Sequence, residues 1–215
     1  MTKKYELVLD DTISFWGWKL FRIRALISFG SVEVGDLGGY IEKEENLSHD
    51  GNAWVSGNAE VWGNAKVSGN AKVSGNAEVS GNAKVSGNAK VSGDAEVWGN
   101  AWVSGNAKVS GNAKVSGDAE VWGNAEVWGD AEVSGDAEVW GNAKVSELGD
   151  IIVFKNHWSS GRHFTYTKSN KMWKVGCFYG TGQELIEKAY RDSEKSGNYY
   201  KACVDFVENL EKLGD

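Results

Sequence analysis

The residues best suited to binding chemistry lie near the C-terminal end of the chain, where cations alternate with aromatic side chains between Phe154 and Tyr166. An aromatic ring can stack on a nucleobase while Lys or Arg neutralises a phosphate, so this mixture could hold a nucleotide or single-stranded nucleic acid. The same pattern also fits, more simply, a small domain whose rings form the core and whose cations face water. The candidate ligand-binding residues are Lys155, His157, Arg162, His163, Lys171 and Trp173.

Histidine and cysteine, the side chains that most often serve as catalysts and metal ligands, are scarce in this chain. The histidines are His49, His157 and His163, and the cysteines are Cys177 and Cys203. Their spacing matches no metal-ligand pattern and forms no recognisable catalytic constellation. We therefore expect no catalytic residue, no metal and no cofactor, and a chain that is not an enzyme.

The composition favours a cytoplasmic protein. The N-terminal residues lack the long apolar run of a signal peptide, and no stretch approaches the ~20 apolar residues that span a bilayer. The two cysteines are then most simply free thiols in a reducing compartment. The formal net charge is −7, and no block of the sequence resembles the basic tail of a nucleic-acid-binding protein.

An uninterrupted short repeat occupies the middle of the chain and must position the residues around it. Residues 51–146 contain sixteen consecutive units of the form G-[N/D]-A-x-V-[S/W]. A fixed short period indicates a stacked solenoid. Ala and Val lie two positions apart and face one side of a strand, while x faces the other. Gly followed by Asn or Asp supplies a turn every six residues.

Three units make a coil of eighteen residues with a triangular cross-section, in which Val and Ala line the interior. The sequence therefore predicts a mainly β fold, a single-stranded parallel β-helix in the form of a triangular prism, with a cap at each end. We expect an N-terminal antiparallel β cap at residues 1–37, the hexapeptide-repeat β-helix at 38–148, and a small C-terminal α+β domain at 149–215. The absence of proline agrees with a backbone whose N–H groups are used in strand pairing.

The N-terminal cap is expected to consist of short strands at 5–9, 19–29 and 31–34. Its aromatic side chains would cover the open end of the valine interior: Trp16, Trp18, Phe21 and Phe29.

The coils are expected to begin before the regular repeats. Ile41 and Leu47 share the six-residue register of Ala53, so an irregular first coil would start near Gly38.

The C-terminal segment is expected to form strands at 151–154, 163–167 and 172–178. Two amphipathic helices follow, the first of which opens with a capping box at residues 181–184. The second helix carries an apolar stripe of Tyr200, Cys203, Phe206, Val207, Leu210 and Leu213.

The segment that leads into the coils resembles a known family. The runs GDLGGYIE at 35–42, NLS at 46–48 and GNAWV at 51–55 are similar to those of phage and bacterial hexapeptide-repeat proteins, often labelled transferases or polymer-forming proteins. The resemblance implies a left-handed β-helix behind an antiparallel sheet and a phage or prophage setting, without a known reaction. Acyltransferases with such coils carry a catalytic His on them, whereas residues 51–148 contain no His.

An eighteen-residue coil places the outward x positions in three columns. The first holds Trp54, Lys72, Lys90, Lys108, Glu126 and Lys144; the second holds Glu60, Glu78, Glu96, Lys114 and Glu132; the third holds Lys66, Lys84, Trp102, Glu120 and Glu138. Like charges stacked at the coil spacing are mildly unfavourable, so the first two columns invite a partner of opposite sign.

The third column predicts a homodimer, because its charges reverse about Trp102. A two-fold axis through Trp102 would pair every Lys of one copy with a Glu of the other, and a central Trp is a usual anchor. The alternative is that Lys and Glu vary freely on a solvated wall. The predicted interface residues are Lys66, Lys84, Trp102, Glu120, Trp122, Glu138 and Trp140.

The function predicted from these features is that of a non-enzymatic, phage-type β-helix protein in the bacterial host cytoplasm. Its rigid surface would bind a host protein, including a component of a bacterial defence system that it inhibits. An acidic cluster could imitate a nucleic-acid backbone, although seven lysines on the repeats weaken that version: Asp118, Glu120, Glu126, Asp130, Glu132, Asp136 and Glu138. The alternative is a C-terminal module that binds a nucleotide or nucleic acid, with the β-helix as spacer and oligomerisation scaffold.

Overall fold

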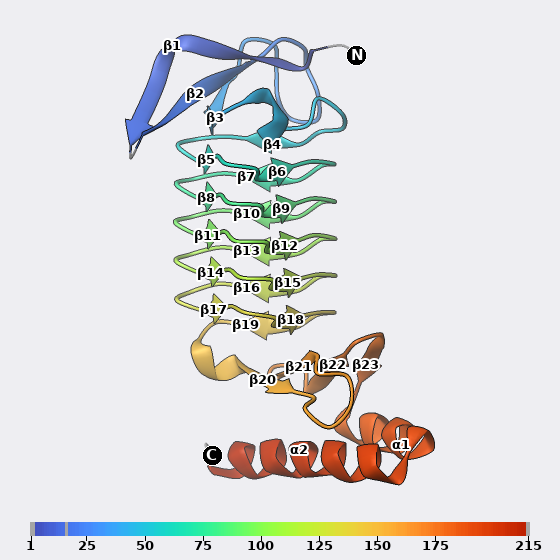
Figure 1. Cartoon of the computed structure of the whole chain (residues 1–215). Coiled ribbons are helices and arrows are strands. Elements are labelled where there is room, and N and C mark those ends of the chain that lie inside the picture. The colour runs from blue at the N-terminus through green and yellow to red at the C-terminus, as the bar shows by residue number, and fades with distance from the viewer. Residues whose placement is uncertain (1–2, 16, 214–215) are drawn as a thin grey trace. The chain divides into compact units, whose positions relative to one another are not determined.

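The computed structural model describes residues 3–15 and 17–213, which form two compact units divided between Leu148 and Gly149. The expectation for Trp16 lies outside the described residues. The first unit contains an antiparallel N-terminal sheet and a parallel β-solenoid, and the second contains an antiparallel sheet and two helices (Figure 1). The predicted fold class is therefore confirmed.

Three flat walls make up the solenoid, and each is named here after its outward side chains. The glutamate wall consists of β5 (Glu60–Val61), β8 (Glu78–Val79), β11 (Glu96–Val97), β14 (Lys114–Val115) and β17 (Glu132–Val133). The lysine wall consists of β4 (Trp54–Val55), β7 (Lys72–Val73), β10 (Lys90–Val91), β13 (Lys108–Val109), β16 (Glu126–Val127) and β19 (Lys144–Val145). The tryptophan wall consists of β6 (Lys66–Val67), β9 (Lys84–Val85), β12 (Trp102–Val103), β15 (Glu120–Val121) and β18 (Glu138–Val139).

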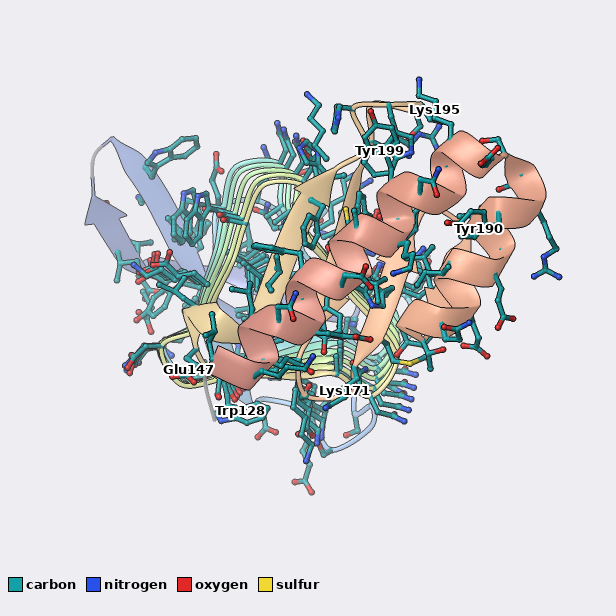
Figure 2. All side chains as sticks on the ribbon, turned by 90° about the horizontal axis from the view of Figure 1, so that it is seen from below. Trp128, Glu147, Lys171, Tyr190, Lys195 and Tyr199 are labelled. Atoms are coloured by element: carbon teal, nitrogen blue, oxygen red, sulfur yellow. The ribbon has the colours of Figure 1, made fainter. Side chains whose placement is uncertain are left out.

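Positions eighteen apart lie directly over one another, as the repeat predicts. Trp102 pairs with Lys84 on one side and with Glu120 on the other, and the pairing is parallel. Every Ala and Val of the repeats is at most 1 % exposed, so the interior is a dry column of small apolar side chains. Seen along the axis, the side chains of successive coils overlay in rows (Figure 2).

The corners depend on glycine and on the residue that follows it. The repeat glycines at 51–141 have φ between 64 and 75°, a left-handed conformation that L side chains rarely adopt. The Asn side chains then form ladders between coils: Asn88 Nδ2 donates to Asn106 Oδ1 at 3.0 Å. Where Asp replaces Asn, the carboxylate accepts from the Asn of the preceding coil, as Asp118 does from Asn100 at 2.8 Å.

The N-terminal strands extend the glutamate wall. β1 (Tyr5–Phe15) and β2 (Trp18–Ala25) form an antiparallel hairpin, and β3 (Leu37–Ile41) pairs with β2 on one side and with β5 on the other. The expected strand at 31–34 is wrong, since only a bridge between Phe29 and Val32 forms there. The hairpin thereby protects the first edge of this wall from pairing with another chain.

Two glycines allow the chain to enter the first coil. A Cβ at Gly38 would lie 2.4 Å from the Ile23 side chain, and one at Gly39 would lie 2.4 Å from the Ala59 carbonyl oxygen. Neither position has room for a side chain, which explains the Gly-Gly pair.

The first coil begins near Gly38 as predicted, but its register differs. Ile41 pairs with Val61 and Leu47 with Val67, each twenty positions on, so both side chains continue the valine columns. The two additional residues lie between Leu47 and Val55, which are eight positions apart, whereas their partners Val67 and Val73 are six apart. The short helix η1 (Glu44–Asn46) precedes them, between Ile41 and Leu47.

Polar side chains close the first edges of the other two walls. Lys4 Nζ donates to the carbonyl oxygens of Ala53 at 2.8 Å and Gly51 at 3.4 Å. The buried Asn46 amide donates in the same way to the carbonyl oxygens of Ala65 at 2.9 Å and Gly63 at 3.2 Å. Free carbonyls at the end of the stack are therefore satisfied by side chains.

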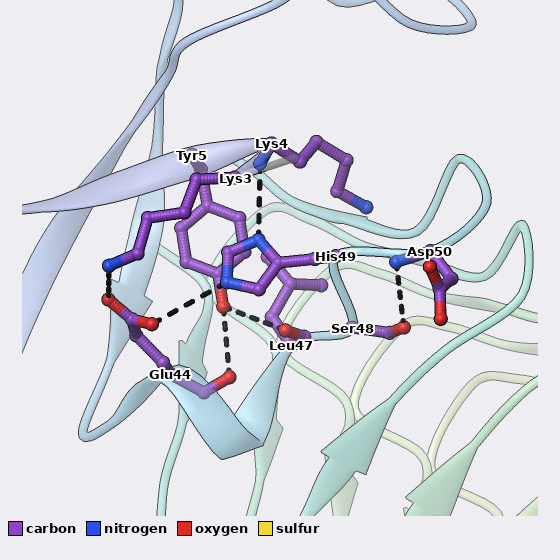
Figure 3. A network of polar contacts seen from close by, with 8 residues as sticks. All are labelled: Lys3, Lys4, Tyr5, Glu44, Leu47, Ser48, His49 and Asp50. Carbon is purple, nitrogen blue, oxygen red and sulfur yellow. Dashed lines mark hydrogen bonds and ion pairs between the residues drawn. The ribbon is translucent and has the colours of Figure 1, made fainter. Parts of the chain in front are cut away.

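Tyr5 and His49 attach the first strand to this cap (Figure 3). The Tyr5 hydroxyl donates to the carbonyl oxygens of Leu47 at 2.7 Å and Glu44 at 2.9 Å. His49 Nδ1 accepts from the Lys4 backbone N–H at 3.2 Å, and its ring stacks on Tyr5 with centroids 4.4 Å apart. Burial, together with the carboxylates of Glu44 and Glu45, raises the pKa of Tyr5.

The expected aromatic cover is only partly correct. Trp18 is 40 % exposed, whereas the aliphatic Leu20 and Ile23 are fully buried with Tyr5. Phe29 does pack against the solenoid, edge-to-face on Trp54 with ring centroids 5.5 Å apart.

Lys4 is expected to make stability rise with pH. Burial lowers its pKa from 10.5 to about 8, so between these values the unfolded chain binds more protons than the folded one, and raising the pH favours folding. The expected gain between about pH 7.5 and 9.5 is about 2 kcal/mol, from about 1.4 kcal/mol per proton and pH unit. Urea unfolding of the wild type beside Lys4→Met measures it, and equal pH slopes for the two proteins would contradict it.

The second unit has the predicted sheet and two helices, but the expected strand at 172–178 is two strands separated by a turn at Gly176 and Cys177. η2 (Leu148–Asp150) leads into β20 (Ile151–Lys155), β21 (His163–Thr167), β22 (Met172–Val175) and β23 (Phe178–Gly180), which form one antiparallel sheet in that order. α1 (Gly182–Asp192) and α2 (Glu194–Leu213) follow, and the capping box at Thr181 is present.

Aromatic side chains of the sheet and apolar side chains of the helices form the core of this unit. Its buried residues include Phe164, Trp173, Leu185 and Val204. Figure 2 shows α1 and α2 side by side, and Tyr190 of α1 lies against Gly197 of α2, where a Cβ would come within 2.2 Å of the ring. The predicted stripe of α2 is wrong at Phe206, Leu210 and Leu213, which are 51 %, 39 % and 82 % exposed.

Candidate interaction surfaces

A strip of three tryptophans, Trp102, Trp122 and Trp140, runs along the tryptophan wall. The ring centroids of Trp102 and Trp122 are 4.4 Å apart in an edge-to-face arrangement, and those of Trp122 and Trp140 are 5.6 Å apart and nearly parallel. Trp102 Nε1 donates to Ser86 Oγ at 3.1 Å, and Lys84 Nζ lies 5.9 Å from the Trp102 ring centroid. The rings fix one another, so the strip is ordered before any partner arrives.

The structure places all seven residues predicted for a dimer interface on this one wall. Five are the outward residues of its strands, and Trp122 and Trp140 join them through the ring contacts. Sequence reasoning missed the serines that share a column with Trp122 and Trp140, namely Ser68, Ser86 and Ser104. They could have been found from the sequence by listing the sixth residue of every third repeat unit, which shows that these serines stack in one column with Trp122 and Trp140.

The glutamate wall stacks carboxylates on successive coils. Glu78 pairs with Glu60 on one side and with Glu96 on the other. Partial burial, with a smaller contribution from the neighbouring carboxylate, raises the pKa of both Glu60 and Glu78. Lys114 Nζ lies 3.8 Å from Glu96 Oε1 and relieves only the far end of this ladder.

Removing one charge from this ladder is expected to stabilise the protein. A raised pKa means that the folded state binds the proton more tightly, so the ionised Glu78 costs stability at neutral pH and the cost disappears in acid. Glu78→Gln should gain a few tenths of a kcal/mol at pH 7 and nothing near pH 3.5. Glu126→Gln is the control of opposite sign, because a hydrogen bond and the charge of Lys108 lower the pKa of Glu126. Equal effects of the two variants in thermal unfolding would contradict this interpretation.

The lysine wall is less uniform than its column suggests. Lys72, Lys90 and Lys108 stack on successive coils, and Lys108 Nζ forms an ion pair with Glu126 at 2.7 Å. Trp54 begins this column but is only 6 % exposed. Phe29 and Tyr5 of the cap pack edge-to-face on it, so Trp54 belongs to the core rather than to a binding surface.

The charge of the solenoid changes sign along its length. Residues 51–116 carry six lysines and four carboxylates, whereas residues 117–146 carry one lysine and seven carboxylates. Because successive coils stack in register, these seven carboxylates lie on less than two coils and face outward on all three sides. The acidic coils, as residues 117–146 are called below, are thus the strongest electrostatic feature of the first unit.

The candidate ligand-binding residues of the second unit do not converge. Lys155 and His163 are cross-strand partners, with His157 and Arg162 in the loop that joins β20 to β21. The His157 ring packs edge-on against Trp158 and Tyr199.

Lys171 follows the opposite end of β21, and Trp173 lies on β22. Trp173 is 2 % exposed and belongs to the core, so the prediction that it offers a stacking platform is wrong: its ring is enclosed by Phe154, Phe164 and Tyr166. Lys171 Nζ lies 3.4 Å from Glu211 Oε2.

A hollow of about 800 Å³ in the second unit is lined by Lys168, Lys171 and Lys212 and by the edge of Trp173. Glu208 and Glu211 line the same hollow. The Tyr166 hydroxyl donates to Glu211, and burial together with this carboxylate raises the pKa of Tyr166. The two carboxylates offset most of the positive charge that a phosphate would need.

Among the described residues, no group of three or more His, Cys, Asp and Glu side chains is placed to hold a metal ion. Within residues 3–15 and 17–213, no helix combines the length and the apolar character needed to cross a bilayer. Comparisons with protein-family models and with curated proteins give no match.

Proposed function

We propose that the chain is a non-enzymatic, phage-type protein of the hexapeptide-repeat family. We also propose that its coils wind in the left-handed sense, as the resemblance to this family implies. It works in the cytoplasm of a bacterial host as a rigid surface that binds a host protein. The resemblance of residues 35–55 to the corresponding segment of phage proteins supports the setting. A stack of coils without loops or insertions supports a role in presenting side chains at fixed spacing.

The acidic coils are the proposed contact surface for the host protein. Seven carboxylates with one lysine, held on a rigid frame, offer a nucleic-acid-binding protein an imitation of a phosphate backbone. This observation carries the proposal, because the upper coils (residues 51–116) carry six lysines and four carboxylates, whereas the acidic coils carry one lysine and seven carboxylates. A component of a bacterial defence system that binds nucleic acid would be inhibited by such occupation.

The test is capture of host proteins from a bacterial lysate by the immobilised full chain. Asp118→Asn, Asp130→Asn, Asp136→Asn and Glu132→Gln together remove four charges, and Asn is the common residue at those three corners, so the fold is kept. The matched control removes four charges from the upper coils: Asp94→Asn, Glu60→Gln, Glu78→Gln and Glu96→Gln.

We expect the wild type and the control to capture the same nucleic-acid-binding protein, and the acidic-coil variant to capture at least about tenfold less, as expected when several charge contacts are lost. Double-stranded DNA added to the beads should release the captured protein. Capture that is indifferent to both DNA and the acidic-coil substitutions would reject this surface.

A second candidate function is nucleotide or nucleic-acid binding by the C-terminal unit, with the solenoid as spacer and oligomerisation scaffold. The lysines of the 800 Å³ hollow favour it, and the ion pair of Lys171 with Glu211 opposes it. A saturable thermal shift of the full chain with nucleotides, reduced by Lys168→Gln, would favour this candidate over the host-protein surface.

A further inference from the structure

The tryptophan wall carries two outward columns, and each has a directional order along the stack. The x column reads Lys66, Lys84, Trp102, Glu120 and Glu138, and the strand pairings place these residues on successive coils. The sixth-position column reads Ser68, Ser86, Ser104, Trp122 and Trp140. One column thus changes from positive to negative and the other from small to large, both about the level of β12.

We infer that the tryptophan wall is the contact face for a second copy of this chain, in an antiparallel dimer centred on β12. The two-fold axis lies in the interface, parallel to the strands, at the level of Trp102. Rotation about this axis reverses the order of the coils in the second copy. The x column of one copy then faces the x column of the other, and the sixth-position columns face each other in the same way. This is the only geometry that brings two such walls face to face with their stacks antiparallel and both columns in register.

The x column then pairs opposite charges throughout. Lys84 faces Glu120 of the second copy, Lys66 faces Glu138, and the two Trp102 rings meet on the axis. Each of the two charge pairs occurs twice because the interface is isologous, whereas the Trp102 contact on the axis occurs once. The positive upper coils of one copy thereby lie along the acidic coils of the other. The uneven distribution of charge along each solenoid is then compensated by the other copy.

The sixth-position column matches in shape rather than in charge. Trp122 faces Ser86 of the second copy, Trp140 faces Ser68, and Ser104 faces Ser104. A large ring therefore meets a small side chain at every level except the central one, where two serines meet. In a parallel arrangement each residue would face one on its own coil level, so Trp122 and Trp140 would lose this match with the serines. The preformed strip of rings lowers the entropy cost of association.

The same rotation applied to the other two walls brings like charges together. On the glutamate wall it would set Glu96 against Glu96 and Glu60 against Glu132. On the lysine wall the axis would fall between β10 and β13 and set Lys90 against Lys108. Of the three walls that the described residues form, the tryptophan wall is the self-complementary one in both charge and size.

The size of the wall sets the expected affinity. Five strands about 4.8 Å apart give a face about 24 Å tall, which buries less than the ~800 Å² per partner of a standard interface. We therefore expect a weak dimer, with a dissociation constant in the micromolar range. The dimer interface includes Glu120 and Glu138, two of the seven carboxylates of the acidic coils, and leaves the other five outside it. The capture variants change no residue of the tryptophan wall, so the two proposals can be tested separately.

Sedimentation of the full chain from about 1 to about 300 µM, the range in which such an interface dissociates, tests the inference. The wild type should pass from monomer to dimer in this range, and Trp102→Glu should remain monomeric because two carboxylates meet on the axis. Lys84→Glu and Glu120→Lys should each be monomeric, and the double variant Lys84→Glu/Glu120→Lys should dimerise again. Lys90→Glu on the lysine wall is the matched control and should leave the dimer intact.

The two single charge-reversal variants also test the register. Mixed in equal amounts, Lys84→Glu and Glu120→Lys should form a heterodimer, since both contacts then join opposite charges. A wild type that stays monomeric at the highest concentration, an unaffected Trp102→Glu, or a double variant that fails to dimerise would each overturn the inference. Circular dichroism of every variant confirms the fold, and these x positions already accommodate Lys, Glu and Trp along the repeats.

Discussion

Val97→Asp is expected to destroy the solenoid at its middle, at a cost of about 5 kcal/mol or more. Val97 is fully buried and pairs with Val79 on the preceding coil and Val115 on the next, so an introduced carboxylate would have neither water nor a cation. A coil cannot form this column alone, because each coil is held by its two neighbours. Disruption of the packing at β11 therefore removes the contact that joins the coil before it to the coil after it.

The measurement is the urea midpoint of Val97→Asp beside Glu96→Asp. The neighbouring Glu96 faces outward, and shortening it should change stability by no more than about 0.5 kcal/mol. If Val97→Asp unfolded at the same urea concentration as its control, the dry interior would be contradicted.

Gly99→Ala is expected to have the second largest effect, about 2 to 4 kcal/mol. Gly99 has φ +72°, a conformation that costs an L residue about 1 to 2 kcal/mol, and a Cβ there would lie 2.9 Å from the backbone nitrogen of Gly117 on the next coil. The clash is with backbone atoms of Gly117, so it cannot be relieved by a side-chain rotation.

Gly135→Ala is the matched control for this corner. Gly135 has nearly the same φ, +64°, but a Cβ there would have nothing within 4 Å. The control should lose only the conformational cost of about 1 kcal/mol, and the difference between the two variants measures the close stacking of the corners. Equal losses at Gly99 and Gly135 would mean that the corners are not stacked at this spacing.

The repeats could be predicted from the sequence because every unit supplies the same local information. Ala and Val at alternate positions fix the inward face, and Gly with Asn fixes the corner, so the column of Lys84, Trp102 and Glu120 follows from the period alone. Nothing in the repeats interrupts this period, and the structure confirms it at each pairing.

The ends could not be predicted in the same way, because tertiary contacts override local pattern there. Lys4 looks like a solvent-exposed residue, yet it caps two carbonyls inside the fold. Trp18 looks like a core residue, yet it lies at the exposed end of a hairpin, while Leu20 and Ile23 fill the interior. Such choices depend on which segment reaches the end of the stack.

The candidate site shows the same division. The tryptophan wall is a consequence of the repeat, so its seven residues were predicted on one face. The C-terminal candidates depended on aromatic rings being exposed, and Trp173 is instead enclosed by the other rings of the sheet. A mixture of cations and aromatics in sequence cannot distinguish a core from a binding surface.

Disulfide mapping between outward serines tests most directly the arrangement on which every proposed surface depends. In a background of Cys177→Ser and Cys203→Ser, the pair Ser74→Cys/Ser92→Cys places two thiols on adjacent coils, about 4.8 Å apart along the stack and within the reach of a disulfide. The control pair, Ser74→Cys/Ser86→Cys, lies twelve positions apart on different walls. Rapid, complete oxidation of the first pair within the monomer and none of the second is the predicted result; cross-linking of the second pair, or failure of the first, would contradict the eighteen-residue coil.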